Sequence, residues 1–256
     1  MNFEHFHKQE HDFIQKATDW LNQVYYGQKI KITKFLTPRE QQIIQIVVNS
    51  QDDVFLEFEG GINNAERKRA IFYPSFMLDK TNLNTVIGYE IEYNRKLFQL
   101  EHRQILGSLT ALNVDRNLIG DILIQSSRRI YLCVCEEYAA FFEQEFNQVG
   151  KYPIRLRQVD INHLQREEHY ETFEIIVSSM RLDVVVANMI KVSRSQVHQI
   201  ITEGRVQVNW TPEQNHSRHC VVGDILSVKG RGRFKLLSHK SQTKSGKSVI
   251  VVGKTV

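Results

Sequence analysis

The fold of the last third of the chain is decided by residues 181–209, which read RLDVVVANMIKVSRSQVHQIITEGRVQVN. Its first part carries apolar residues at i, i+3, i+4, i+7 and i+8, the spacing of one helix face. These residues are Leu182, Val185, Val186, Met189 and Ile190. Ser193 and Gln196 then form the pattern of a capping box, which marks the start of a second helix. Gly204 is the residue type that commonly ends a helix. The stretch predicts two short helices joined by a tight turn.

A small antiparallel sheet is predicted after Gly204. Val206, Val208 and Trp210 alternate with Arg205, Gln207 and Asn209, as in a strand with one buried face. Further strands are expected over residues 224–229, 233–236 and 248–252. Between them, glycines flank Arg231 and Arg233, which would let the backbone approach a partner closely. The same pattern also makes ordinary hairpin turns.

Basic charge is concentrated in this part of the chain. The net charge is +4, but residues 1–180 hold 20 Lys+Arg against 25 Asp+Glu, whereas residues 181–256 hold 13 against four. A basic segment attracts polyanions by releasing their condensed counterions. Nucleic acid is therefore the leading partner. An anionic membrane and a solvated basic surface without a partner are the alternatives.

Several polar residues fall outside the apolar stripes of the two helices. Arg181, Lys191 and Arg194 are expected to lie together at the turn, and His198 lies outside the stripe of the second helix. The backbone N–H groups at Ser193 to Ser195 could hold a phosphate at the start of that helix. This arrangement suits a bent nucleic-acid backbone.

The middle of the chain gives the order strand, helix, strand, strand, helix, strand. The expected elements span residues 86–93, 100–112, 121–124, 130–135, 136–149 and 154–161. This βαββαβ order is the ferredoxin-like arrangement, which RNA-recognition motifs also use. A true recognition motif displays aromatic residues on its central strands, but residues 128–135 offer only Tyr131. The order alone does not imply RNA binding.

The first 80 residues predict two helices followed by a short strand-rich unit. Thr37 can cap the second helix, with Pro38 at its first position and Glu40 reaching back. A strand is expected over residues 54–58. The charged run at residues 66–69 is interpreted as either a phosphate contact or a solvated helix face. The whole is an α+β chain of three small domains, with boundaries expected at 1–80, 81–178 and 179–256.

The sequence gives little support for a membrane protein, a disulfide-bonded protein, a metal site or a catalytic triad. No run is long enough to span a membrane, and the N-terminus does not resemble a secretion signal, so a cytoplasmic protein is expected. Three cysteines do not predict a disulfide framework, and Cys133 and Cys135 alternate as buried strand residues do. His5, His7 and His11, and the cluster of His216, His219 and Cys220, lack further ligands at metal spacing. No metal, cofactor or catalytic triad is expected, and Gly107-Ser108 and Gly120-Asp121 are interpreted as packing or turn positions.

The C-terminal segment resembles the α-L RNA-binding module first named for ribosomal protein S-four. The matching residues are Arg181-Leu182-Asp183, Val192-Ser193-Arg194-Ser195, Gly204 to Asn209 and Val222-Gly223-Asp224. The resemblance implies RNA contacts through Arg181, Lys191, Ser193, Arg194, Ser195, Arg205 and Asn209. His198, Arg231 and Arg233 join them as candidates.

The chain as a whole resembles the YlmH family of Gram-positive bacteria. The resemblance rests on Thr37 to Glu40, Gly60-Gly61 with Ala65 to Arg69, His102 to Leu109 and Ile119 to Ile122. It implies a non-catalytic protein of ribosome-associated quality control, which binds the large ribosomal subunit, its rRNA and tRNA when peptidyl-tRNA is stranded there. A monomer is expected, and the family's cell-division gene neighbourhood makes cell-division proteins further candidate partners.

Two other readings remain. Many pseudouridine synthases also carry this module, usually at the N-terminus, and their catalytic domain needs an Asp in an Arg-Leu-Asp context. Here the single Arg-Leu-Asp is Arg181-Leu182-Asp183, inside the module. A protein-interaction scaffold at the division site, with incidental RNA binding, would use the acidic first 180 residues. RNA binding should weaken steeply with salt, whereas an apolar protein interface should not.

Overall fold

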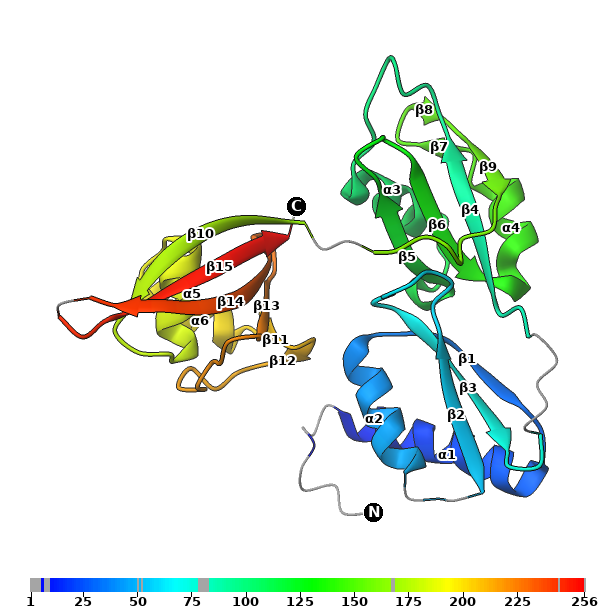
Figure 1. Ribbon diagram of the computed structural model, residues 1–256, viewed down its shortest axis with the longest axis horizontal. Helices are drawn as coiled ribbons and strands as arrows, with labels where there is room; N and C mark the ends of the chain where they lie inside the picture. Colours follow the sequence, from blue (N-terminus) through cyan, green and yellow to red (C-terminus); the bar gives the residue numbers. More distant parts are fainter. Residues whose placement is uncertain are drawn as a thin grey trace. The chain divides into compact units, whose positions relative to one another are not determined.

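The computed structural model describes residues 6, 10–49, 51, 53–77, 83–166, 169–243 and 245–255. Its fold is α+β, as predicted, and the chain divides into two compact units, residues 1–166 and 167–256. Figure 1 shows the elements of both units. Within the described residues, no helix is long and apolar enough to cross a membrane.

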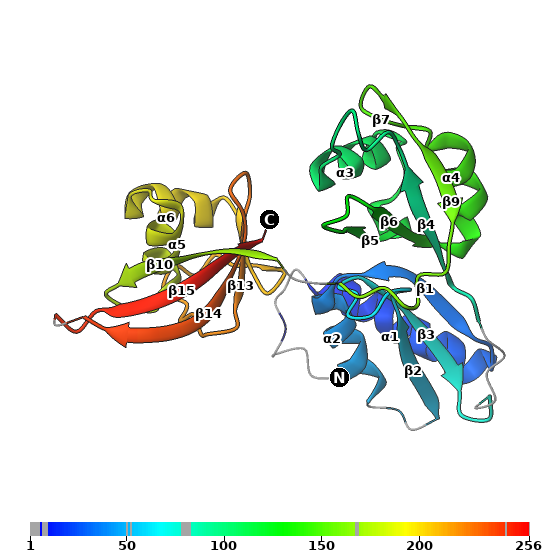
Figure 2. The same ribbon diagram turned by 45° about the horizontal axis from the view of Figure 1, so that its top comes forward.

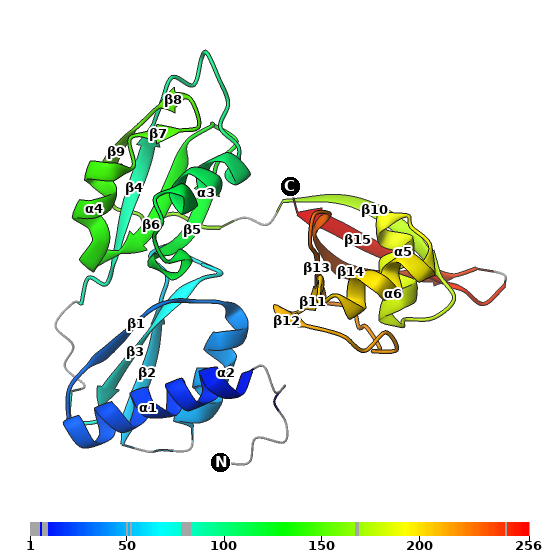
Figure 3. The same cartoon turned by 180° about the vertical axis from the view of Figure 1, so that it is seen from behind.

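The first part of unit 1 places two helices on one three-stranded sheet. Its elements are α1 (His11–Gly27), β1 (Lys31–Leu36), α2 (Pro38–Val48), β2 (Val54–Glu59) and β3 (Lys68–Pro74). The antiparallel sheet has the order β1-β3-β2. Both helices lie against the same side of it (Figure 3). Thr37 and Glu40 form the predicted capping box at the start of α2. The core consists of buried side chains of α1 and α2 packed on Ala70 and Phe72.

Two expectations for this part are wrong. Strand β1 lies between the helices, where no strand was predicted, because its hydrophobic pattern is short and irregular. The charged run at residues 66–69 is no solvated helix face: Lys68 and Arg69 begin β3. Arg69 is 2% exposed and donates hydrogen bonds to Glu137 and to the Thr33 carbonyl. An ion pair with a residue far along the chain keeps this arginine inside.

The second part of unit 1 has the predicted βαββαβ order. Its main elements are β4 (Val86–Glu92), α3 (His102–Ala111), β5 (Ile119–Ile124), β6 (Ile130–Cys135), α4 (Ala139–Glu145) and β9 (Arg155–Gln158). Single turns of 3-10 helix, η2 (Arg116–Leu118) and η3 (Glu136–Tyr138), precede β5 and α4, and a small hairpin, β7 (Gln148–Val149) and β8 (Tyr152–Pro153), precedes β9. The antiparallel sheet order β5-β6-β4-β9 is that of a ferredoxin-like fold.

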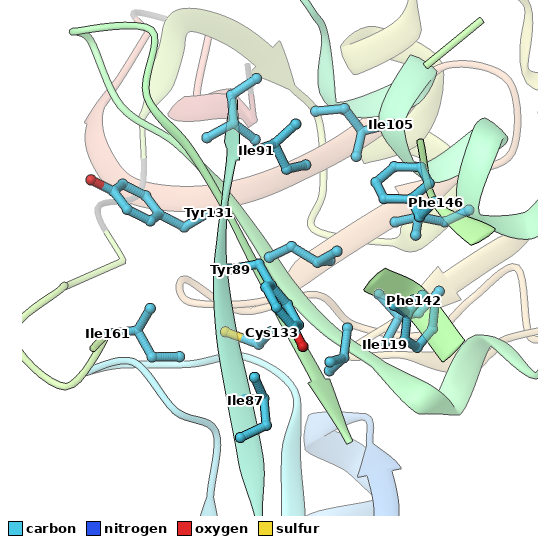
Figure 4. Close-up of a cluster of buried hydrophobic side chains, with 14 of the residues drawn as sticks. Ile87, Tyr89, Ile91, Ile105, Ile119, Tyr131, Cys133, Phe142, Phe146 and Ile161 are labelled. Atoms are coloured by element: carbon cyan, nitrogen blue, oxygen red, sulfur yellow. The ribbon is translucent and has the colours of Figure 1, made fainter. Parts of the chain in front are cut away.

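One face of this sheet packs on the helices. Figure 4 shows Phe142 and Phe146 on the helix side of β4, and Tyr131 and Ile161 on the other side. Cys133 and Cys135 are buried in β6 as unpaired thiols, and Cys220 is buried in unit 2. Burial raises the pKa of Cys135 to about 11 and that of Cys220 to about 12, so these thiols are inert at neutral pH.

Packing explains Gly120-Asp121, as expected. A side chain at Gly120 would meet the Phe35 ring at 2.7 Å, which only glycine avoids. Asp121 accepts hydrogen bonds from the backbone of Glu66 and Arg67 at 2.7 and 3.1 Å. These two positions therefore join the middle sheet to the N-terminal part of unit 1. Gly107 differs, because it lies on exposed α3 with open space around it.

Unit 2 packs two helices on a six-stranded antiparallel sheet. Its elements are β10 (Tyr170–Val177), α5 (Leu182–Ile190), α6 (Arg194–Thr202), β11 (Val206–Val208), β12 (Thr211–Pro212), β13 (Ile225–Val228), β14 (Gly232–Gln242) and β15 (Ser248–Thr255). The strand order is β10-β15-β14-β13-β11-β12. Helices α5 and α6 lie together on one side of β10, β15 and β14 (Figure 2). The two predicted helices are confirmed.

The sheet of unit 2 is larger than the sequence indicates. Strand β10 pairs with β15 along its whole length, from Tyr170 with Thr255 to Val177 with Ser248. Residues 170–177 therefore belong with the C-terminal sheet, although a boundary after residue 178 was expected. Phe173, Ile175 and Val177 point toward the core, while Thr172, Glu174 and Ile176 are exposed, so β10 has the alternation of a half-buried strand. A separate domain boundary near residue 80 stays a prediction.

Candidate nucleic-acid interface

The two helices of unit 2 meet at a turn that is fixed by local hydrogen bonds. Helix α5 ends at Ile190, and the next residue, Lys191, caps it in the left-handed conformation with φ 54°. Ser193 begins α6 with the predicted capping box: its hydroxyl accepts from the Gln196 backbone, and the Gln196 side chain accepts from the Ser193 backbone. Ser193 and Ser195 are exposed. The turn therefore displays Lys191, Ser193 and Ser195 on a rigid backbone.

A buried carboxylate holds the cationic side chains at this turn. The Asp183 side chain is 0% exposed and lies in the first turn of α5. It accepts hydrogen bonds from Arg181 Nε and Nη2 at 3.1 and 3.3 Å, and from Arg194 Nη2. His198 Nε2 lies 3.1 Å from the same carboxylate. One anion inside the protein thus gathers side chains from both helices, an arrangement called here the Asp183 cluster.

The Asp183 carboxylate stays ionised at neutral pH. Burial alone would raise its pKa, but hydrogen bonds from Arg181, Arg194 and His198 hold that pKa well below the usual range. These three partners remain accessible, since the side chains of Arg181, Arg194 and His198 are 42%, 57% and 46% exposed. Two guanidinium groups against one carboxylate leave a positive surface. Their orientation is set before any ligand arrives, which lowers the entropy cost of binding.

A loop far along the chain completes the cluster. His216 donates no side-chain bond to Asp183, but its backbone carbonyl accepts from the Asp183 N–H at 3.1 Å. Its ring stacks on that of His198 with the centroids 4.4 Å apart. The Arg218 carbonyl accepts from the Leu182 N–H at 2.8 Å. The loop therefore fixes the start of α5 and the plane of the His198 ring.

The other candidates form a second group on the strands. Arg205 is exposed and lies 3.4 Å from Glu203, and its carbonyl accepts from the Lys229 N–H at 3.0 Å. Arg231 is exposed in the turn between β13 and β14. Arg233 lies over the Trp210 ring at 5.8 Å. This group is basic and partly exposed.

Asn209 serves the fold. Its amide nitrogen donates to Asp224 at 2.8 Å, and its amide oxygen accepts from the Ile225 N–H at 2.9 Å. Its backbone is left-handed, with φ 50°. These two bonds hold Asn209 in the turn after β11 and leave one amide N–H and one oxygen lone pair, so its contact with RNA stays a prediction.

Two contributors to the site were not among the sequence candidates. Asp183 and His216 contact the proposed RNA-binding side chains. A lone aspartate inside the apolar run of α5 was a usable signal, because a buried charge demands partners. The stacking of His216 on His198 joins residues 18 apart through the fold, and no local pattern predicts it.

The carboxylate of the Arg-Leu-Asp triplet is enclosed by its partners. Asp183 of the Arg-Leu-Asp triplet is fully buried behind Arg181, Arg194 and His198, so its carboxylate cannot reach a substrate. Among the described residues, no group of three or more His, Cys, Asp or Glu side chains could hold a metal ion. His5 and His7, weighed above as ligands, lie outside the described residues.

Comparisons with known proteins find family matches in both units of the chain. Residues 82–163 match a family model described as "Putative RNA-binding domain in YlmH", and residues 180–226 match the S4 domain. A Bacillus subtilis protein named "Ribosome-associated protein quality control protein P2" is 35% identical over 246 residues, covering 96% of this chain and 95% of that protein. The solved structure "Cell division protein ylmH from Streptococcus pneumoniae" has a TM-score of 0.53 at 22% identity and covers 62% of this chain and 96% of its own.

Proposed function

The chain belongs to the YlmH family, and from that premise we propose that it is a non-catalytic protein that binds structured rRNA and tRNA on the large ribosomal subunit. Its role would be ribosome-associated quality control in the cytoplasm, acting as a monomer on subunits that carry stranded peptidyl-tRNA. The Bacillus subtilis relative bears a name of this kind. The S4 domain supplies the RNA-binding module.

The Asp183 cluster is the observation that carries this proposal. Arg181 and Arg194 are half-exposed guanidinium groups that share one buried carboxylate. Such groups bind phosphate oxygens through paired N–H donors, and fixing them beforehand favours a shaped RNA backbone over free ions. Lys191, Ser193 and Ser195 border the cluster at the turn. The residues suit backbone recognition by charge and shape.

The charge of unit 2 favours the same partner. Residues 181–256 hold 13 Lys+Arg against four Asp+Glu. The second group, with Arg205, Arg231 and Arg233, would extend the contact along the RNA. Binding that releases counterions from several phosphates should weaken steeply as the salt concentration rises.

Sedimentation of the tagged chain from cells tests the proposal. Lysates are run through sucrose gradients, and RNA crosslinked to the chain is recovered from each fraction. We expect co-migration with free large subunits, together with crosslinks to large-subunit rRNA and tRNA. A chain that stays at the top of the gradient without RNA would overturn the proposal and favour a protein-interaction role in cell division, which the name of the Streptococcus pneumoniae relative invites.

A further inference from the structure

The ferredoxin-like sheet of unit 1 has one face that the helices do not cover. Residues of β4 alternate, so that Tyr89 and Ile91 enter the helix-side core while Gly88 and Glu90 point the other way. Ile161 covers one half of that second face, because a side chain at Gly88 would meet it at 2.4 Å. Tyr131 lies on the same side as Ile161 (Figure 4). The half around Glu90 carries a group of arginines.

Glu90 is a buried carboxylate surrounded by cations. Its side chain is 4% exposed, and it accepts hydrogen bonds from Arg95 and Arg157. Arg129 Nε lies 3.8 Å from the same carboxylate. Arg157 also donates to Glu92 at 2.7 Å. The side chains of Arg129 and Arg157 are 53% and 51% exposed, so burial of the anion leaves the cations facing solvent.

Two more arginines extend this group. Arg155 pairs in register with Glu92 and is exposed, and Arg128 donates to the Arg95 carbonyl at 3.2 Å. The group, called here the Glu90 patch, consists of Arg95, Arg128, Arg129, Arg155 and Arg157 with Glu90 and Glu92. Residues 83–166 hold ten Lys+Arg and ten Asp+Glu in all. Five arginines and two acids of a segment without net charge therefore lie near one another, with Arg128 in the turn beside this face.

We propose that the Glu90 patch is a second RNA-binding surface, which contacts the phosphate backbone through Arg128, Arg129, Arg155 and Arg157. It repeats the chemistry of the Asp183 cluster, in which a buried carboxylate orients half-exposed guanidinium groups. Guanidinium forks match phosphate oxygens. This surface goes beyond the proposed function, which requires only the C-terminal residues.

The contact is to phosphate and not to stacked bases. Tyr131, the aromatic residue that a recognition motif would use for stacking on this strand, is 5% exposed and pairs across the sheet with Glu90. Its ring is therefore not available as a platform. Binding by charge alone predicts little sequence preference and strong dependence on salt.

The test removes charge from the patch while sparing the fold. The double variant Arg129→Gln/Arg155→Gln leaves Arg95 and Arg157 bound to Glu90, so that the buried carboxylate keeps its two hydrogen-bonded partners. The matched control, Arg103→Gln/Lys151→Gln, removes two charges from α3 and the β7–β8 hairpin of the same unit. Thermal unfolding of both full-length variants checks that each is folded.

Affinity for deproteinised large-subunit rRNA is then measured from 50 to 200 mM salt. Loss of two phosphate contacts should make the slope of log K against log salt shallower by about 1.4–1.8. The affinity of the patch variant should therefore fall by a factor that is roughly tenfold smaller than the factor for the wild type between 50 and 200 mM salt. An unchanged slope, equal to that of the control, would overturn the proposal. Weaker capture of intact subunits with unchanged binding to bare rRNA would also overturn it, since the partner would then be a protein.

The same measurement in the Arg181→Ala/Arg194→Ala background separates this surface from the proposed function. If the patch lowers the slope by the same amount in both backgrounds, the two surfaces bind RNA independently. If the Glu90 patch variant lowers the slope and Arg181→Ala/Arg194→Ala does not change it, this inference stands and the proposed function is wrong. The opposite result would overturn only the inference.

Discussion

Asp183 in the first turn of α5 accepts a hydrogen bond from Arg194 in the first turn of α6, which ties the beginnings of the two helices together. The bond joins residues 11 positions apart across the turn. The carboxylate is buried and the guanidinium is 57% exposed, so a buried anion fixes the position of a cation at the surface. The proposed RNA binding and the stability of unit 2 therefore depend on one residue, and the two can be measured separately.

Replacing Asp183 by alanine should destabilise unit 2 by about 2 kcal/mol, because bonds from charged donors to a buried acceptor are lost. The chain has two tryptophans, Trp20 in unit 1 and Trp210 in unit 2. Urea unfolding followed by Trp210 fluorescence, in a Trp20→Phe background, reports on unit 2. The control Glu174→Ala removes an exposed ion pair with Lys240 and should cost less than about 0.5 kcal/mol. Equal losses in the two variants would contradict the anchoring role.

Acid should weaken unit 2 through the same carboxylate. The pKa of Asp183 is well below its usual range in the folded chain, whereas it returns to about 3.9 on unfolding. This difference stabilises the folded state above about pH 4 to 5 and is lost as the pH falls toward the folded pKa. The free energy of unfolding, measured from pH 6 to 3, should therefore fall less steeply in Asp183→Asn than in the wild type. Parallel curves for the two proteins would show that this pKa is not depressed.

Two glycines in unit 1 should respond to alanine with opposite signs. Gly107 lies on exposed helix α3 with open space around it, so Gly107→Ala should stabilise by roughly 0.5–1 kcal/mol. Gly120→Ala should destabilise by about 1–3 kcal/mol, because its new methyl would meet the Phe35 ring at 2.7 Å. Unfolding followed by Trp20 fluorescence, in a Trp210→Phe background, measures both. The same sign for both variants would refute the packing described for Gly120.

Arg69 should stabilise unit 1 alone. Arg69 is 2% exposed and bonds to Glu137 and the Thr33 carbonyl. Arg69→Met should therefore lower the free energy of unfolding by about 2–3 kcal/mol. This loss is smaller than for a fully buried pair because Glu137 is half-exposed. The control Arg103→Met alters a side chain that is 84% exposed and should change little. Unfolding of unit 2, followed at Trp210, should be the same in both variants. A loss of stability in unit 2 as well would mean that the two units unfold together.

Features that depend on neighbours in the sequence were predicted correctly. The capping boxes at Thr37 and Ser193 need only residues three apart, and both are present. The βαββαβ order of the middle sheet follows from alternating and helical periodicity, which are local properties. The cationic candidates at the α5–α6 turn were found in the same way.

Features that depend on distant partners were missed. The place of β10 in the C-terminal sheet is set by its pairing with β15, and Arg69 is buried against Glu137, which lies 68 positions away. Charged residues in a sequence are read as solvated unless a partner is known. Asp183, Glu90 and Arg69 were overlooked for this reason, although buried charges organise both candidate RNA-binding surfaces.

Binding of the chain to purified large ribosomal subunits at 100 mM salt tests the central claim most directly. The variant Arg181→Ala/Arg194→Ala is compared with Lys240→Ala/Lys247→Ala, which removes two exposed charges from the β14–β15 hairpin of the same unit. Loss of two phosphate contacts should raise the Kd by about 30-fold for the arginine pair, and the lysine pair should change it far less. A Kd for the arginine variant within about twofold of the lysine control would contradict the claim that the Asp183 cluster binds RNA.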